Sequence, residues 1–238
     1  MLGFEWLESL LIGAVISSTD AASVFSVLRS KKLNLRYGTA SILELESGSN
    51  DPWAYMLTVI ILSVMKGGAT AGGFVVSLLA QVFFGVGFGA LISLGAVYLI
   101  KRVRFDAAGF DAIFVTAIAI LSYALPSAVG GNGYLSCYIV GIVLGNTKIS
   151  GKTALVHFFD GITGFTQILL FFLLGLLAFP SQMPSIILPA AAIALFLTFV
   201  ARPAAVTVIM KPFGAKWKQI ALISWAGLRL SLIHISEP

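Results

Sequence analysis

Long hydrophobic runs separated by short polar loops dominate the chain, and their lengths predict its fold. A helix needs about 20 mostly apolar residues to span a bilayer. By this criterion the pattern predicts eight membrane-spanning segments, at residues 6–28, 37–65, 73–100, 110–129, 133–146, 161–179, 184–209 and 217–233. Residues 148–160 predict a separate short helix at the membrane interface. The predicted fold class is an all-α polytopic membrane protein.

Basic residues alternate between successive loops, and this alternation supports the division into eight segments. The loop at 29–36 contains Lys and Arg, the next contains only Lys66, and the third, fifth and seventh loops are again basic. Cytoplasmic loops are enriched in Lys and Arg. We therefore expect the odd-numbered loops on the cytoplasmic side and the N-terminus on the outer side.

Four carboxylates interrupt the first two hydrophobic segments. Asp20 lies in the first segment, and Glu44, Glu46 and Asp51 lie in the second. A charge at the bilayer centre costs about 2.5–3.5 kcal/mol on insertion scales, so such residues usually bind or move something charged. Counting about 1.5 Å per residue from the predicted cytoplasmic ends puts these acids and Arg229 roughly 11–21 Å deep. This shared depth favours one site for a cation and a proton.

The second segment divides its polar residues between two neighbouring helical faces. Residues three, four or seven apart share a face, which groups Glu44 with Ser47 and Asp51, and Glu46 with Asn50. The simplest division gives the first face to oxygen ligands of a cation. The second face would then supply Glu46 as the carboxylate that a buried Arg229 needs. Glu44 stays undecided between this site and the headgroup region.

Two prolines add further expectations. Pro52 follows Asp51 and lacks an N–H, so it predicts irregular helix at Asp51 and a freed carbonyl one turn earlier. Such backbone at membrane depth lines cavities and helps to bind ions. Arg202, beside Pro203, is expected to extend its side chain to the cytoplasmic interface.

Composition supports the membrane class and argues against others. Mean hydropathy is +1.00, and charged residues make up 11% of the chain, against about 25% in soluble domains. The net charge of +5 does not indicate nucleic-acid binding, because the basic residues sit in short loops between apolar runs. The single cysteine, Cys137, excludes a disulfide within the chain.

Three ordered motifs resemble those of a known family. They are Ser18-Thr19-Asp20-Ala21-Ala22, the stretch from Glu44 to Asp51-Pro52, and Trp225-Ala226-Gly227-Leu228-Arg229. Together they resemble the monovalent cation/proton antiporters of the NhaP type. The similarity is closest to the potassium/proton branch, which includes cell volume regulation protein A. It extends over nearly all of residues 6–229, including Gly131-Asn132-Gly133.

The resemblance implies an inverted-repeat fold with interrupted helices, an ion-binding core and a homodimer of the full-length protein in the cell inner membrane. It implies that Asp51 carries a monovalent cation and a proton alternately. It surrounds the ion with Asp20, Thr19, Ser47 and Asn50, and it pairs Glu46 with Arg229. The transported K⁺ or Na⁺ and H⁺ are substrates, and the family implies no cofactor.

The chain departs from the family pattern at both ends. The helices expected before the Thr19-Asp20 motif are absent, and residues 230–238 replace the expected continuation after Arg229. That tail resembles translated sequencing adapter, so we expect it to be non-native. Residues 1–229 would then be an incomplete exchanger domain, a fragment truncated at both ends.

The sequence therefore predicts secondary transport rather than enzymatic catalysis. K⁺, or alternatively Na⁺, would exchange for H⁺ at an alternating-access carboxylate site, where burial favours the protonated acid and a cation favours the carboxylate. Two alternatives remain open, a cation channel-like subunit without proton coupling and a non-transporting membrane fragment. An intramembrane hydrolase is poorly supported, because the sequence has no His–Glu metal motif and no Ser–His pair at a common depth.

Overall fold

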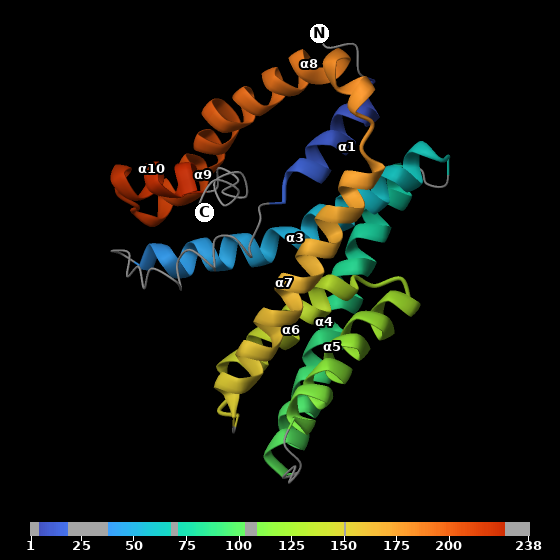
Figure 1. The fold of residues 1–238 in the computed structure, drawn as a ribbon, viewed down its shortest axis with the longest axis vertical. Helices are drawn as coiled ribbons and strands as arrows, with labels where there is room; N and C mark the ends of the chain where they lie inside the picture. Colours follow the sequence, from blue (N-terminus) through green and yellow to red (C-terminus); the bar gives the residue numbers. More distant parts are fainter. Residues whose placement is uncertain (1–4, 19–37, 68–70, 103–108, 150, 227–238) are drawn as a thin grey trace. The chain divides into compact units, whose positions relative to one another are not determined.

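The computed structural model describes residues 5–18, 38–67, 71–102, 109–149 and 151–226, and within these ranges the regular structure is helical (Figure 1). The α-helices are α1 (Trp6–Ile16), α3 (Thr39–Met65), α4 (Ala71–Arg102), α5 (Phe110–Ala128), α6 (Gly133–Asn146), α7 (Lys152–Leu177), α8 (Met183–Phe196), α9 (Arg202–Met210) and α10 (Trp217–Ala226). Short turns of other helix types lie at Pro180–Gln182, Leu197–Ala201 and Lys211–Phe213. In the described residues, α8, the turn at Leu197–Ala201 and α9 follow one another without a break and match the predicted segment 184–209.

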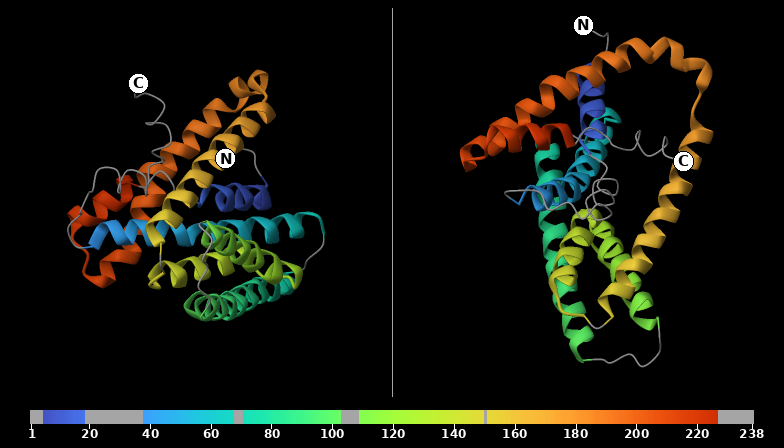
Figure 2. Two further views of the ribbon diagram at one scale, coloured as in Figure 1. Left: turned by 60° about the horizontal axis from the view of Figure 1, so that its bottom comes forward. Right: turned by 60° about the vertical axis from the view of Figure 1, so that its left-hand side comes forward.

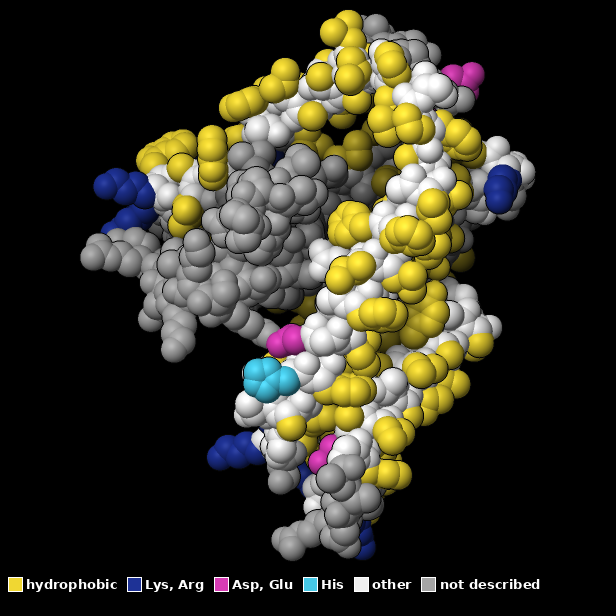
Figure 3. Space-filling model, viewed as in Figure 1, with side chains coloured by type: hydrophobic (Ala, Val, Ile, Leu, Met, Phe, Trp, Pro, Cys, Tyr) yellow, Lys and Arg dark blue, Asp and Glu magenta, His cyan; other side chains and the backbone are white. Residues whose placement is uncertain are grey.

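Four stretches of the described chain are helical, long and apolar enough to cross a membrane: Gly72–Arg102, Phe110–Ala128, Lys152–Leu177 and Ile186–Phe213. The helices α1 and α6 are apolar but shorter. Large hydrophobic side chains are exposed along these helices, as the yellow atoms over α7 and α8 show (Figure 3). Outward-facing apolar side chains are expected where lipid replaces water as the solvent.

The chain divides into two compact units, and two helices contribute to both. One unit contains residues 4–18 and 49–167, and thus α1, most of α3, α4, α5, α6 and the first part of α7. The other contains residues 1–3, 19–48 and 168–238, and thus the start of α3, the end of α7, and α8, α9 and α10.

In the first of these units α4, α5 and α6 pack side by side (Figures 1 and 2). Ala96, Ile118, Val140 and Leu144 form its buried cluster. The close approach of α5 to the start of α6 requires glycine at position 133, because a Cβ atom there would lie 2.5 Å from the carbonyl oxygen of Tyr123 on α5. Small residues at helix contacts are the usual means of close packing in membranes.

In the second unit α9 and α10 pack against the start of α3. Leu43, Val206, Ile220 and Ile223 form the buried cluster there. The turn at Leu197–Ala201 is a π-helix, in which the N–H of Arg202 donates to the carbonyl of Leu197. Pro203, at the start of α9, has no N–H to give to the helical ladder, and wide turns of this kind commonly occur where a helix accommodates such a defect.

Three sequence predictions about the backbone need correction or fall outside the described residues. Residues 148–160 do not form a separate interfacial helix, because α7 runs continuously from Lys152 to Leu177. The helix is not irregular at Asp51, since α3 continues through Pro52. The first predicted segment is helical to Ile16, and its part beyond Ser18 lies outside the described residues.

Candidate functional site

Asp51 accepts a hydrogen bond from the side chain of Ser18, which lies just past the end of α1. The helix α1 ends at Ile16. The next residue, Ser17, donates hydrogen bonds from both its N–H and its hydroxyl to the Ala14 carbonyl. Serine hydroxyls compete in this way with the helical ladder and favour helix ends. Ser18 then donates its hydroxyl to Oδ1 of Asp51. The hydrogen bond joins the first motif of the sequence to the second.

The other predicted site residues lie on α3 or outside the described residues. Ser47 is buried, Asn50 is half-buried and Asp51 is exposed. Ser47 and Asp51 are four residues apart in a continuous α-helix, so they occupy one helical face as predicted. For Glu44 the structure describes only its backbone place on α3. Thr19, Asp20, Arg229 and the tail at 230–238 lie outside the described residues.

Asn132 fixes the backbone next to Asp51 and was not among the predicted site residues. It is 1% exposed and precedes α6, where its Oδ1 accepts the N–H of Leu135 at 3.0 Å as the helix cap. Its Nδ2 donates to the carbonyl oxygen of Pro52 at 2.9 Å. Its own N–H donates to the carbonyl of Gln81 at 3.1 Å. One buried residue therefore links α3, α4 and α6.

A cluster of three tyrosines lies beside this link. The rings of Tyr55 and Tyr134 have centroids 4.5 Å apart, and those of Tyr123 and Tyr134 have centroids 5.2 Å apart. Tyr55 follows Asp51 by four residues on α3, so it lies on the same face one turn further along. Such tilted ring pairs contribute about 0.5–1.5 kcal/mol beyond their buried area. They add to the fixation of α3 against α5 and α6.

Glu46 has an arginine partner, but its described partner is Arg202. Nη2 of Arg202 lies 2.8 Å from Oε1 of Glu46, with side-chain exposures of 13% and 30%. The same guanidinium donates to the backbone carbonyls of Ser224 and Ile223 on α10. The predicted extension of Arg202 to the cytoplasmic interface is therefore wrong. The predicted pairing of Glu46 with Arg229 stays a prediction, because Arg229 lies outside the described residues.

Two features of the sequence pointed toward these missed residues. Asn132 stands between Gly131 and Gly133 and before an apolar run, which is the pattern of a helix cap. Arg202 precedes Pro203 inside a hydrophobic segment, and a charge inside such a segment usually has a partner. Neither pattern names the partner, which depends on how the helices pack.

The site offers oxygen ligands without a dense metal-binding cluster. Within the described residues no group of three or more His, Cys, Asp and Glu side chains could hold a metal ion together. The end of α1 and the Ser47–Asp51 turn of α3 instead provide oxygen atoms from hydroxyl, amide, carbonyl and carboxylate groups. Oxygen ligands of this kind suit hard cations.

Comparison with known proteins identifies the family. The model of the family described as "Sodium/hydrogen exchanger, transmembrane" matches residues 1–235. The chain is 40% identical over 232 residues to the K⁺/H⁺ antiporter NhaP of Alkalimonas amylolytica. It is 39% identical over 239 residues to the K⁺/H⁺ antiporter NhaP2 of Shewanella oneidensis. Each alignment covers 96% of this chain but 40% of the relative, so the chain spans about two fifths of their length.

A solved structure supports the fold. The sodium proton antiporter MjNhaP1 from Methanocaldococcus jannaschii superimposes with a TM-score of 0.75 at 22% sequence identity. The match covers 94% of this chain and 59% of that one. Together with the apolar helices, this likeness confirms the predicted all-α, multi-pass membrane fold. The family model and the two relatives above confirm the predicted resemblance, and the chain belongs to the transmembrane sodium/hydrogen exchanger family.

Proposed function

We propose that this chain carries the ion-exchange site of a monovalent cation/proton antiporter, with Asp51 binding cation and proton in turn. The observation that carries the proposal is the hydrogen bond from Ser18 to Asp51. Ser18 immediately precedes Thr19 and Asp20 in the sequence, so the bond ties the first motif to the Asn50–Asp51 pair. We include Thr19, Asp20, Ser47 and Asn50 in the proposed site.

The chemistry of exchange follows from how Asp51 is neutralised. The serine hydroxyl is neutral, so this bond orients the carboxylate without bringing a positive charge to it, and a charge within the membrane is costly. A cation or a proton can each remove that cost, and the two compete for the same oxygens. Coupling then requires that the occupied site be exposed alternately to the two sides, which inverted-repeat carriers achieve by rocking one bundle against another.

K⁺ is the favoured cation, and Na⁺ is the alternative. The two K⁺/H⁺ antiporters named above are about 40% identical to this chain, whereas the Na⁺/H⁺ antiporter NhaS2 of Synechocystis is 28% identical over 204 residues. This chain spans about two fifths of the length of the K⁺/H⁺ relatives. We therefore propose complete transport only for a protein of the relatives' full length that contains this chain. We further propose a homodimer in the cell inner membrane, with the N-terminus of this chain outside.

The test is a chimera in which residues 1–229 replace the matching segment of the Shewanella oneidensis NhaP2 protein. Everted membrane vesicles with a preset pH gradient would be challenged with K⁺ and then with Na⁺ while a pH-sensitive dye reports dequenching. We expect dequenching by K⁺ that is lost in Asp51→Asn. Asp111→Asn, at the start of α5, removes a carboxylate from outside the proposed site and serves as the matched control.

The remaining outcomes separate the alternatives. Cation-dependent proton flux that persists in the Asp51→Asn chimera would reject Asp51 as the exchanging group. Electrical conduction by the chimera without coupled proton flux would favour the channel-like subunit. Exchange by the chimera but not by the 238-residue chain alone would mean that this chain contains the site but not the complete transport path.

A further inference from the structure

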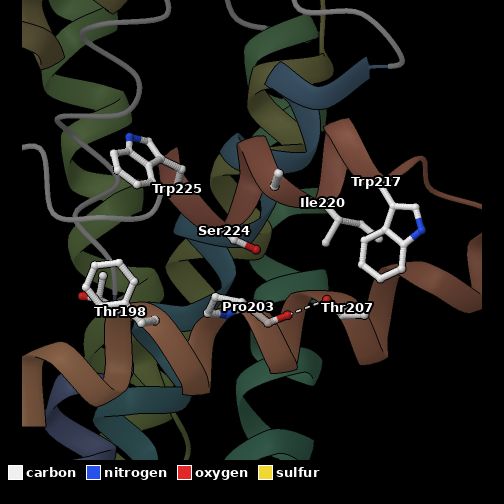
Figure 4. Close-up of a pocket in the computed structure, with 9 residues that line it drawn as sticks. Thr198, Pro203, Thr207, Trp217, Ile220, Ser224 and Trp225 are labelled. Atoms are coloured by element: carbon white, nitrogen blue, oxygen red, sulfur yellow. Dashed lines mark hydrogen bonds between the residues drawn. The ribbon is translucent and has the colours of Figure 1, made fainter.

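An apolar groove runs between the π-turn and α9 on one side and α10 on the other. Its volume is about 310 Å³, at the lower end of the roughly 300–1,000 Å³ of small-molecule sites. Six of its lining residues are apolar, namely Phe199, Pro203, Trp217, Ile220, Ala221 and Trp225. Figure 4 shows the two tryptophans at opposite ends of α10, with Ile220 between them and Pro203 facing them from α9.

Three hydroxyl side chains line the groove, and those of Thr207 and Ser224 add little polar surface to its wall. Thr207 donates its hydroxyl to the carbonyl of Pro203 at 2.6 Å, shown as the dashed line in Figure 4. Ser224 is 8% exposed, and its hydroxyl oxygen is buried. Phe199, Trp217 and Trp225 are instead 64–69% exposed. The surface that a ligand meets is therefore aromatic and aliphatic, which suits a hydrocarbon chain.

One end of the groove is basic. Nζ of Lys211 lies 5.4 Å from the centroid of the Trp217 ring, and Lys216 and Lys218 flank Trp217 in the sequence. All three lysines are exposed, and Figure 3 shows dark-blue side chains at the end of the α9–α10 pair. A tryptophan with neighbouring lysines is typical of the boundary between hydrocarbon and headgroups. Charge and apolar wall thus meet at Trp217.

We propose that this groove binds one anionic phospholipid. An acyl chain would lie along Ile220 between the two tryptophans, and the phosphate would lie at Lys211 and Lys218. A phospholipid matches the groove because it joins one anionic end to one apolar chain. Basic residues next to a membrane span on the cytoplasmic side attract anionic lipid. The connection between α9 and α10, which contains Lys211 and Lys216, is on the predicted cytoplasmic side. The proposal does not depend on the transport function of Asp51.

Tryptophan fluorescence provides a direct test. The chain has four tryptophans, so replacing Trp6 and Trp53 by Phe leaves the two tryptophans of the groove, Trp217 and Trp225, as reporters. The purified chain is reconstituted into phosphatidylcholine vesicles with a minor fraction of brominated phosphatidylglycerol or, at the same fraction, brominated phosphatidylcholine. Quenching by the phosphatidylglycerol should be stronger, and the difference should shrink as salt is raised.

Substitutions then locate the site. Lys211→Gln with Lys218→Gln should weaken the preference for phosphatidylglycerol by about five-fold for each lysine removed. The control, Lys148→Gln with Lys152→Gln, removes two other exposed lysines on the predicted cytoplasmic side and should leave the preference unchanged. Ala221→Phe fills the groove and should lower quenching by the bound lipid while all lysines remain.

Three results would overturn the proposal. Equal quenching by the two lipids would mean that the groove has no charge preference. An equal loss in the Lys148/Lys152 control would mean that the preference belongs to the whole basic surface. No quenching by either lipid would mean that protein, not lipid, covers Trp217 and Trp225. Helical circular dichroism of each variant shows whether a lost preference reflects loss of the fold.

Discussion

Two of the carboxylates on α3, Glu46 and Asp51, are held in opposite ways. Glu46 is paired through its side chain, by an arginine that also binds two carbonyls of α10. Asp51 accepts a hydrogen bond from the neutral hydroxyl of Ser18. The backbone beside it is held by Asn132, whose side-chain amide donates to the carbonyl of Pro52. The guanidinium brings a positive charge to Glu46, whereas the Ser18 hydroxyl orients Asp51 and brings no charge.

This difference is the one we expect between a structural charge at Glu46 and the proposed exchangeable charge at Asp51. A group whose charge is already balanced gains little from a cation, and its removal damages the fold. A group that must change its partner during each cycle needs a fixed backbone, because its own side chain cannot be the anchor. The contrast predicts that substitutions at Asp51 affect transport, and those at Glu46 and Arg202 affect stability.

The largest expected effect is the loss of transport in Asp51→Asn. In the chimera this change should reduce K⁺-dependent dequenching to the background of empty vesicles, because an amide cannot alternate between a cation and a proton. Glu46→Gln should retain exchange in proportion to the amount of folded protein. The protein level of both variants is measured by immunoblot. Equal residual exchange in the two variants would remove the proposed distinction.

The next effect is on stability and concerns the ion pair. Arg202→Ala leaves Glu46 without its described guanidinium, and breaking such a pair should cost about 3 kcal/mol, near the lower end for buried pairs because Glu46 is partly exposed. Arg202→Ala combined with Glu46→Gln should recover part of that loss, because no lone charge is then left at position 46. The free energies of unfolding of the two single variants and the double variant in detergent give the coupling energy. Strictly additive losses would mean that the pair contributes nothing of its own.

Helix lengths were predictable where glycine and polar residues punctuate the hydrophobic pattern. The segment predicted at 133–146 coincides with α6, and those at 73–100 and 110–129 agree with α4 and α5 to within two residues. The start of α7 was missed because its first turns are polar enough to suggest a separate interfacial helix. Whether the helix continues through Gly161 depends on how it packs, which the sequence pattern does not give. The π-turn before Arg202 was missed for a related reason, since Pro203 indicates a defect but not its geometry.

The candidate site was predictable as a set of residues on one helix, but not as a set of contacts. Spacing alone put Ser47 and Asp51 on one face, because helical periodicity is local. The described partners of the two acids are distant in the sequence. Ser18 is 33 residues from Asp51, and Arg202 is 156 residues from Glu46. Contacts over such separations depend on which helices meet, and hydrophobic periodicity does not encode that. The proposed role of Asp51 in ion exchange stays a prediction.

A smaller effect is expected from loss of the backbone anchor. Asn132→Ala removes the cap of α6 and leaves the Pro52 carbonyl without its amide donor, which together should cost about 2 kcal/mol. Asn132→Asp keeps an oxygen for the cap but loses the donor, so it separates the two contributions. Thermal unfolding followed by tryptophan fluorescence measures both variants. If Asn132→Asp were as stable as the parent, the bond to Pro52 would not anchor α3.

The smallest effect tests whether that anchor depends on close packing of α6. A methyl group on Gly133 would lie 2.5 Å from both the Ser127 hydroxyl oxygen and the Tyr123 carbonyl, so Gly133→Ala should force a shift and cost about 1–2 kcal/mol. Gly141, on the same helix, has nothing within 4 Å of the added atom. Gly141→Ala should therefore stabilise the helix by up to about 1 kcal/mol. Opposite signs for the two variants in one unfolding assay would show that packing, not helix propensity, sets the position of α6. Equal signs would mean that α6 can move, and the anchor of Asp51 would then have to come from α3 and α4.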